Sequence, residues 1–175
     1  MKLTPIKILA GTAIILSIFA AIVGSPFSSK KSYINPEQFA DSLIAKKQNL
    51  IIVDLRDKKD YNDYHIPSAL NVNVARIDPS AFNKNNMIVF YSGRDNLSKA
   101  VQYKFEKEGF GNAYFLNGGI DDWMNKILFP VLPKSSSKAK KKNFERIERR
   151  SMYFGGQPER EDKSSTKKVY RREGC

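Results

Sequence analysis

The sequence predicts an α/β fold, built on a small and largely parallel sheet with helices on both faces. Three short apolar runs have the composition of strands that are buried on both sides, namely Leu50–Val53, Met87–Tyr91 and Ala113–Leu116. Segments with helical spacing separate these runs, and such alternation is typical of parallel sheets. Between residues 32 and 133, 12 basic side chains balance 12 acidic ones, so this region can form a core without a large net charge.

The other elements of this region follow in chain order. Residues 32–34 indicate a short edge strand. A helix is expected to begin after Asn35, because Asn favours the N-cap and Pro36 the first helical position, and to end near Lys47. Further along the chain we predict one or two helical turns at 57–64, a strand at 69–74 and a turn or short helix at 78–82. Two more helices are expected, one from the loop after Tyr91 to about Glu108 and one at 120–126. Trp123 of the last helix is expected to pack onto the sheet with Phe129.

Residues 8–24 form an apolar run without a charged side chain. Because a membrane-spanning helix needs about 17–25 such residues, we predict a single-pass membrane anchor within residues 1–31. Its lipid-facing residues are expected to be Ile8, Ile14, Ile15, Leu16, Ile18, Phe19, Ile22 and Val23. A cleaved secretory signal and a buried helix of a soluble core are the alternatives. Basic residues flank both ends of the run, so they do not decide which side of the membrane the domain faces.

Cysteine and histidine are rare in this chain. The sole cysteine is Cys175 and the sole histidine is His65. This composition excludes an internal disulfide framework and a cysteine zinc site, and it argues against histidine-based metal sites. We therefore expect no metal and no cofactor.

The segment after the apolar run Met87–Tyr91 is the candidate functional site. A polar loop, Ser92–Asn96, leads from the predicted strand into a predicted helix. A strand, a tight loop and a helix in this order direct backbone N–H groups and the positive end of the helix into one hollow. Such a hollow suits an anion or an activated thiolate. Here its first residue is a serine, and no cysteine is near it in the sequence.

Several ordered motifs resemble the signatures of rhodanese-like domains. They are Val53–Arg56 followed by Tyr61, the turn His65–Ala69, the segment Gly118–Trp123 and the segment Phe129–Val131. The resemblance covers about residues 32–133. It implies a small parallel sheet wrapped by helices, which agrees with the pattern of strands and helices. The resemblance also places His65 in a structural turn. Independently of the resemblance, we expect Asp54 and Arg56 to tie the strand end to neighbouring loops through an ion pair.

The resemblance further implies a cysteine at the start of the loop, which carries a sulfane sulfur as a persulfide. Ser92 falls at that position and Ser98 matches a serine six residues later, while Asp95 replaces an expected glycine and Leu97 an expected arginine. A serine cannot form a persulfide, and its hydroxyl is not ionised near neutral pH without a neighbouring base. We therefore predict no catalytic residue and a vestigial loop made of Ser92, Gly93, Arg94, Asp95, Asn96, Leu97 and Ser98.

Residues 134–175 form a basic tail with 14 basic and 6 acidic side chains. We predict an extended segment with a short helix at 143–150, in which Glu145 pairs with Arg149. The residues expected to contact a partner are Lys140, Lys141, Lys142, Phe144, Arg146, Arg149, Arg150, Tyr153 and Phe154. Anionic lipid, a nucleic acid and an acidic protein surface are all suitable partners for such a tail.

These observations predict three parts, with boundaries at 1–31, 32–133 and 134–175. The leading hypothesis is a catalytically inactive rhodanese-like protein that serves as an accessory subunit of a larger membrane complex. A respiratory or ATP synthase complex of the mitochondrial inner membrane is the suggested assembly, with a bacterial inner membrane as the alternative. One alternative function is a membrane-bound sulfurtransferase-like protein that binds a small anion or sulfur species at Ser92. Another is binding of nucleic acid or anionic lipid through the tail.

Overall fold

The computed structural model describes residues 31–93, 95–132 and 138–161. Contacts between residues divide the chain into two units, Met1–Lys30 and Lys31–Cys175, and the fold below belongs to the second. The predicted membrane anchor lies outside the described residues and stays a prediction. Among the helices that are described, none is both long enough and apolar enough to cross a bilayer.

A five-stranded sheet forms the centre of the domain, with every pair of neighbouring strands parallel. The strand order is β1-β5-β4-β2-β3, so the predicted edge strand β1 does lie at an edge. The strands are β1 (Tyr33–Ile34), β2 (Leu50–Asp54), β3 (Ala69–Asn71), β4 (Met87–Tyr91) and β5 (Ala113–Leu116). This architecture confirms the predicted α/β fold with a parallel sheet.

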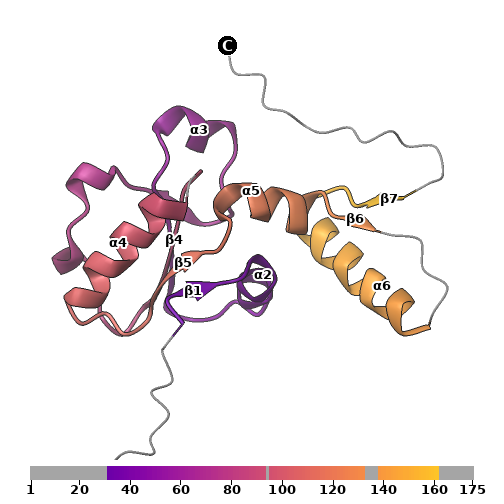
Figure 1. Cartoon of the computed structure of the whole chain (residues 1–175), viewed down its shortest axis with the longest axis horizontal. Coiled ribbons are helices and arrows are strands. Elements are labelled where there is room, and N and C mark those ends of the chain that lie inside the picture. Colours follow the sequence, from indigo (N-terminus) through magenta and orange to yellow (C-terminus); the bar gives the residue numbers. More distant parts are fainter. Residues whose placement is uncertain (1–30, 94, 133–137, 162–175) are drawn as a thin grey trace, which may run out of the picture. The chain divides into compact units, whose positions relative to one another are not determined.

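Helices cover both faces of this sheet. Figure 1 shows α4 on one side of the strands and α2 and α5 on the other. The helices are α2 (Pro36–Ile44), α3 (Lys58–Asp63), α4 (Asp95–Lys107) and α5 (Gly119–Trp123), with short helical turns η1 (Val74–Arg76), η2 (Pro79–Ala81) and η3 (Met124–Leu128). Because side chains alternate along a strand, each central strand contributes to a core on either face.

Two apolar cores result from this alternation. Ile52 and Val89 point into the core beneath α2 and α5, while Val53 and Ile88, one residue along each strand, point into the core beneath α4. All four side chains are almost completely buried. Burial of each side chain contributes roughly 1.5–3 kcal/mol to the stability of the fold relative to an exposed position. Because both faces of β2 and β4 are buried, both strands are continuous apolar runs in the sequence.

The first helix, α2, differs from its prediction at both ends. Asn35 precedes the helix as expected, but its side chain makes no capping hydrogen bond. Its Oδ1 instead accepts a hydrogen bond from Asn117 Nδ2 at 3.4 Å, which links the start of α2 to the end of β5. The helix ends at Ile44, three residues before Lys47, and Lys46 then takes a positive φ of 47° that a continuing helix excludes.

Trp123 packs onto the sheet as predicted, but with different partners. Its fully buried ring contacts Phe39 of α2 and Phe154, with ring centroids 5.7 Å and 5.0 Å away. Phe129, the partner expected from the sequence, is 41% exposed. Phe154, which covers Trp123, is therefore distant from it in the sequence, and local sequence patterns do not indicate contacts over such a distance.

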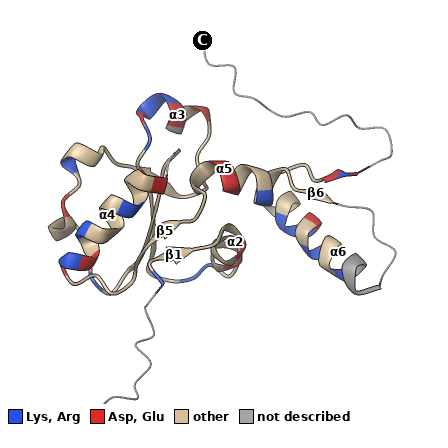
Figure 2. Cartoon of the chain, in the orientation of Figure 1, with Lys and Arg blue, Asp and Glu red and all other residues tan. Residues whose placement is uncertain are grey.

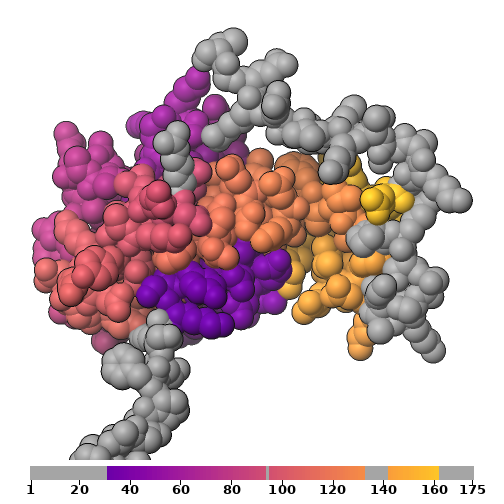
Figure 3. Space-filling view, in the orientation of Figure 1, coloured from indigo at the N-terminus to yellow at the C-terminus, as the bar shows by residue number. Residues whose placement is uncertain are grey.

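Residues 138–161, here called the C-terminal extension, fold onto the domain. They form α6 (Lys138–Tyr153) and β7 (Glu159–Arg160), and β7 pairs in parallel with β6 (Val131–Leu132). Ser151 Oγ donates to the carbonyl of Leu128 at 2.7 Å. In Figure 3 the surface of the extension continues that of the domain. The helix predicted at 143–150 lies within α6, which is longer at both ends. The extended conformation expected for the rest of these residues is corrected, because apolar and hydrogen-bonding contacts with the domain stabilise the longer helix.

Candidate functional site

The loop between β4 and α4 lies at the carboxyl edge of the sheet, as predicted. Ser92 follows β4 directly and Ser98 lies in the first part of α4, with 2% and 0% of their surfaces exposed. Their hydroxyl oxygens are 2.7 Å apart and share a hydrogen bond. Ser92 is therefore held in place by a partner and is not aimed outward as a free nucleophile.

The turn between β5 and α5 fixes the backbone of this loop. The carbonyl of Ser92 accepts a hydrogen bond from the backbone N–H of Ile120 at 3.1 Å. Asp95, the first residue of α4, accepts a hydrogen bond from the backbone N–H of Gly118 at its Oδ2, 3.3 Å away. One backbone–backbone and one backbone–side-chain hydrogen bond thus connect the loop to the same turn. In the sequence Asp95 is only a departure from the family pattern, and no local signal indicates this bracing contact.

Gly119→Ala is expected to displace the loop. A Cβ at this position would lie 2.3 Å from the carbonyl oxygen of Ser92, and Gly119 has a φ of +55° that non-glycine residues rarely adopt. The backbone conformation alone costs about 1–3 kcal/mol, so we expect at least that loss in the free energy of unfolding, measured by urea denaturation. Gly93→Ala is the matched control, because nothing lies within 4 Å of the added Cβ. An equal loss in both variants contradicts the prediction.

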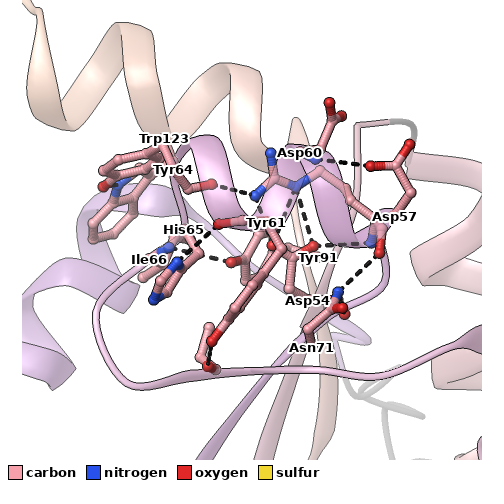
Figure 4. Close-up of polar contacts among 12 residues, drawn as sticks. Asp54, Asp57, Asp60, Tyr61, Tyr64, His65, Ile66, Asn71, Tyr91 and Trp123 are labelled. Carbon is pink, nitrogen blue, oxygen red and sulfur yellow. Dashed lines mark hydrogen bonds and ion pairs between the residues drawn. The ribbon is translucent and has the colours of Figure 1, made fainter.

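At the carboxyl end of β2, next to the end of β4, two oppositely charged side chains form a buried ion pair (Figure 4). Asp54 lies opposite Tyr91 in the register of β2 and β4. Arg56 contacts the Asp54 carboxylate through its backbone N–H and through two guanidinium nitrogens, with Nη2 at 2.6 Å from Oδ2. The same Nη2 donates to the carbonyl of Tyr64 at 2.6 Å. The ion pair predicted from the sequence is confirmed, and its charges are almost fully buried.

The buried pair shapes the protonation of its neighbours. Burial lowers the pKa of Arg56, but the hydrogen bonds and charge of Asp54 outweigh this effect and the net pKa is raised. Burial, reinforced by the negative charge of Asp54, raises the pKa of Tyr91 well above its ordinary value. Arg56 therefore stays charged and Tyr91 stays neutral. The Tyr91 hydroxyl accepts a hydrogen bond from the backbone N–H of Ile66, which connects β4 to the turn after α3.

Aromatic residues around α3 complete this scaffold. Tyr61 donates to the carbonyl of Ala69 at 2.8 Å, and His65 stacks on the Tyr61 ring with centroids 4.0 Å apart. His65 Nδ1 also lies 2.9 Å from the carbonyl of Tyr61. Tyr64 accepts a hydrogen bond from Trp123 Nε1 at 2.9 Å. These contacts indicate structural roles for His65 and both tyrosines.

The predicted site residues divide into three groups. Ser92, Asp95 and Ser98 come together at the loop, while Gly93, Asn96 and Leu97 lie beside it with more of their surfaces exposed. Arg94 lies outside the described residues, as do the side chains of Lys140 and Lys141 in the extension. In the described ranges, no cluster of three or more carboxylate, histidine or cysteine side chains has the arrangement of a metal site.

The tail residues expected to form one partner surface are divided by the fold. Phe154 packs against Trp123, and Arg150 is buried in an ion pair with Asp41 of α2. Arg149 and Tyr153 remain accessible on α6. Within the described part of α6, no ion pair forms between Glu145 and Arg149. Two of the residues predicted to contact a partner, Arg150 and Phe154, therefore contact the chain's own domain instead.

A comparison with protein families matches residues 35–126 to the rhodanese-like domain, which is more than half of the chain. The chain belongs to the rhodanese-like family. The matched residues include the loop, the buried ion pair and the turn that braces the loop. They end before the C-terminal extension, which is an addition to the matched domain.

Relatives of this rhodanese-like chain include named enzymes. It is 28% identical over 82 residues to the thiosulfate sulfurtransferase GlpE of Coxiella burnetii, covering 46% of this chain and 77% of that protein. It is 24% identical over 92 residues to the thiosulfate:glutathione sulfurtransferase of Saccharomyces cerevisiae, covering 44% of this chain and 66% of that protein. A protein of Anabaena sp. with a known crystal structure is 26% identical, with a TM-score of 0.46, over 51% of this chain and 74% of that one.

These names correct two expectations. The sequence predicts an inactive accessory subunit of a membrane complex and not an enzyme, but the relatives of the chain are named sulfurtransferases. The prediction of inactivity rests chiefly on Ser92. The lack of a nucleophile removes the covalent route, but binding and orientation by themselves still accelerate a reaction between two bound reactants. The missing thiol therefore does not establish that the domain lacks activity.

Proposed function

We propose that this chain is a sulfurtransferase that holds an anionic sulfur donor without forming a covalent bond to it, and that an external thiol takes the sulfur directly. Ser92 is proposed to stand where the family has its nucleophilic cysteine. The observation that carries the proposal is the buried hydroxyl pair of Ser92 and Ser98, which occupies the base of the loop without offering a thiol.

Three features support an anion site above this hydroxyl pair. The first turn of α4 begins at Asp95, and the first N–H groups of any helix lack partners within the helix. The positive end of the helix dipole lies at the same point. Gly93 is exposed, so a small anion can approach from solvent. The relatives' names indicate thiosulfate as the donor and a small thiol such as glutathione as the acceptor.

The proposed reaction balances without a group from the protein. The acceptor thiolate attacks the outer sulfur of thiosulfate, and a new S–S bond forms as the old one breaks. Sulfite leaves with the electron pair of the broken bond, and the acceptor becomes a persulfide. The proton of the acceptor thiol is lost to solvent before attack, because the thiolate is the nucleophile. The domain contributes by binding the donor and by stabilising the negative charge that grows on the leaving sulfite.

Sulfite release from thiosulfate and glutathione tests this proposal. We expect release above the uncatalysed rate only when both reactants are present, and intact-protein mass spectra without an added sulfur atom. Ser92→Ala should keep part of the rate, because the serine is not the nucleophile. Cys175→Ser should keep all of it. A protein-bound sulfur before the thiol is added, or a rate equal to the uncatalysed one, overturns the proposal.

Asp95→Asn is expected to tighten donor binding. The Asp95 carboxylate is 29% exposed beside the proposed anion site and repels a dianion. Removing a like charge near the surface is worth roughly 1 kcal/mol, or about fivefold in the dissociation constant for thiosulfate measured by calorimetry. Asparagine keeps an acceptor for the N–H of Gly118, whereas Asp95→Ala removes the charge and the brace together. Weaker binding by Asp95→Asn contradicts this role of the charge.

A further inference from the structure

A second candidate site lies between α2 and α6, in elements that the proposed sulfur chemistry does not use. A hollow of about 270 Å³ opens there to solvent. Its lining residues are Asp41, Ile44, Arg146, Arg149, Arg150 and Tyr153. Four of them belong to the C-terminal extension, outside the residues matched to the family.

One side of this hollow is formed by an ion pair with no net charge. Arg150 is almost completely buried, and its Nε and Nη2 both donate to Asp41 Oδ1, at 3.0 Å and 2.7 Å. A charge-assisted pair of this geometry holds both side chains in one orientation. The Asp41 carboxylate is thus neutralised by Arg150, and the remaining arginines determine the charge of the hollow.

The remaining charge of the hollow is positive. Arg146 and Arg149 lie three positions apart on α6, so they project from adjacent parts of one helix face. Arg146 donates to Asn143 Oδ1 at 3.2 Å, and neither arginine pairs with a carboxylate of the described side chains. Figure 2 shows the basic residues along α6. Two guanidinium groups without an acidic partner among the described side chains are suited to bind carboxylates.

Apolar surface lies between these charges. Ile44 at the end of α2 is 37% exposed, and Tyr153 at the end of α6 is 55% exposed. Both line the hollow beside the arginines. The site therefore combines two cations with an apolar floor, which suits a ligand that carries negative charge next to a hydrophobic group.

The charge of the chain decides which occupant fits. Residues 1–30 and 162–175 are both net basic, and a second copy of the chain carries the same net charge of +12, so like-charge repulsion disfavours each of them. The lining of the hollow has charge and apolar surface side by side, which complements carboxylates next to a hydrophobic side chain. We propose that the hollow binds an acidic segment of a partner protein, in which carboxylates flank a hydrophobic side chain.

Fluorescence anisotropy with the full chain tests this site. The probe is a fluorescein-labelled peptide of alternating glutamate and leucine, titrated at physiological ionic strength. We expect Arg146→Gln/Arg149→Gln to weaken binding at least tenfold, while the matched variant Lys58→Gln/Lys59→Gln changes it less than twofold. The lysine pair lies exposed on α3 and removes the same charge. Tyr153→Ala should weaken binding of this peptide, but not that of an all-glutamate peptide.

Three outcomes overturn the proposal. Equal weakening by the arginine and lysine variants would indicate attraction by net charge alone. A wild-type chain that does not bind the peptide at millimolar concentration would show that the hollow is not a peptide site. Binding to phosphatidylglycerol vesicles, but not to the peptide, with the same loss in the arginine variant would assign the surface to a membrane. Thermal melting of each variant confirms that the fold is retained.

Discussion

Arg56→Met is expected to lower the free energy of unfolding by about 3–5 kcal/mol, because it leaves the buried Asp54 carboxylate without its countercharge. The Asp54 side chain is completely buried, and Arg56 supplies most of its hydrogen bonds. The same change removes the hydrogen bond to the carbonyl of Tyr64. Guanidinium denaturation, monitored by the fluorescence of Trp123, measures the loss.

Two further variants show whether burial of the ion pair causes the loss of stability in Arg56→Met. Lys126→Gln breaks the exposed pair between Lys126 and Asp122 on the α5–η3 segment, and a pair of this kind contributes only about 0–1 kcal/mol. Asp54→Leu/Arg56→Met removes both buried charges and should recover a large part of the stability lost in Arg56→Met. If the double variant is less stable than the single one, the loss does not arise from an unpaired charge.

Ser92→Cys is expected to convert the proposed direct reaction into a covalent one. The new thiol would lie at the end of β4, next to the start of α4, where a helix N-terminus lowers the pKa of a cysteine. Incubation with thiosulfate should then leave one additional sulfur atom on the protein, seen by intact-protein mass spectrometry. Sulfite release should rise by at least about tenfold, which corresponds to about 1.4 kcal/mol of activation free energy.

Ser98→Cys is the matched control for this gain. Its hydroxyl lies 2.7 Å from that of Ser92, but it belongs to α4 and is completely buried. We expect no persulfide and no increase in rate from this variant. A persulfide on Ser98→Cys but not on Ser92→Cys would show that the reactive position of the loop has been assigned to the wrong residue.

The local sequence determined the strands, most of the helices and the site of the loop. Leu50–Val53 and Met87–Tyr91 are continuous apolar runs, and such runs are typical of strands that are buried on both faces. The polar residues that follow each run therefore meet at the carboxyl edge of one sheet. For this reason the amino-acid sequence alone is enough to place Asp54, Arg56 and Ser92 at the same edge.

Contacts between distant residues were decided by the tertiary structure alone. Phe154 covers Trp123, Arg150 neutralises Asp41, and Asp95 accepts from Gly118, although the members of each pair lie on different elements. No periodic pattern indicates such pairs, because the two members of each pair lie too far apart in the sequence. The extension resembles a solvated basic tail for the same reason, since the surfaces that order it come from α2 and η3.

The sequence by itself therefore determined the family, the sheet and the absence of a thiol from the loop. The tertiary structure decided what the departures from the family pattern do. From the sequence, Asp95 is expected to repel anions, but in the fold it also connects the loop to the turn at Gly118 through a hydrogen bond. The difference has a physical origin: propensity and periodicity act over a few residues, whereas hydrogen bonds and packing between elements depend on distances that only the folded chain sets.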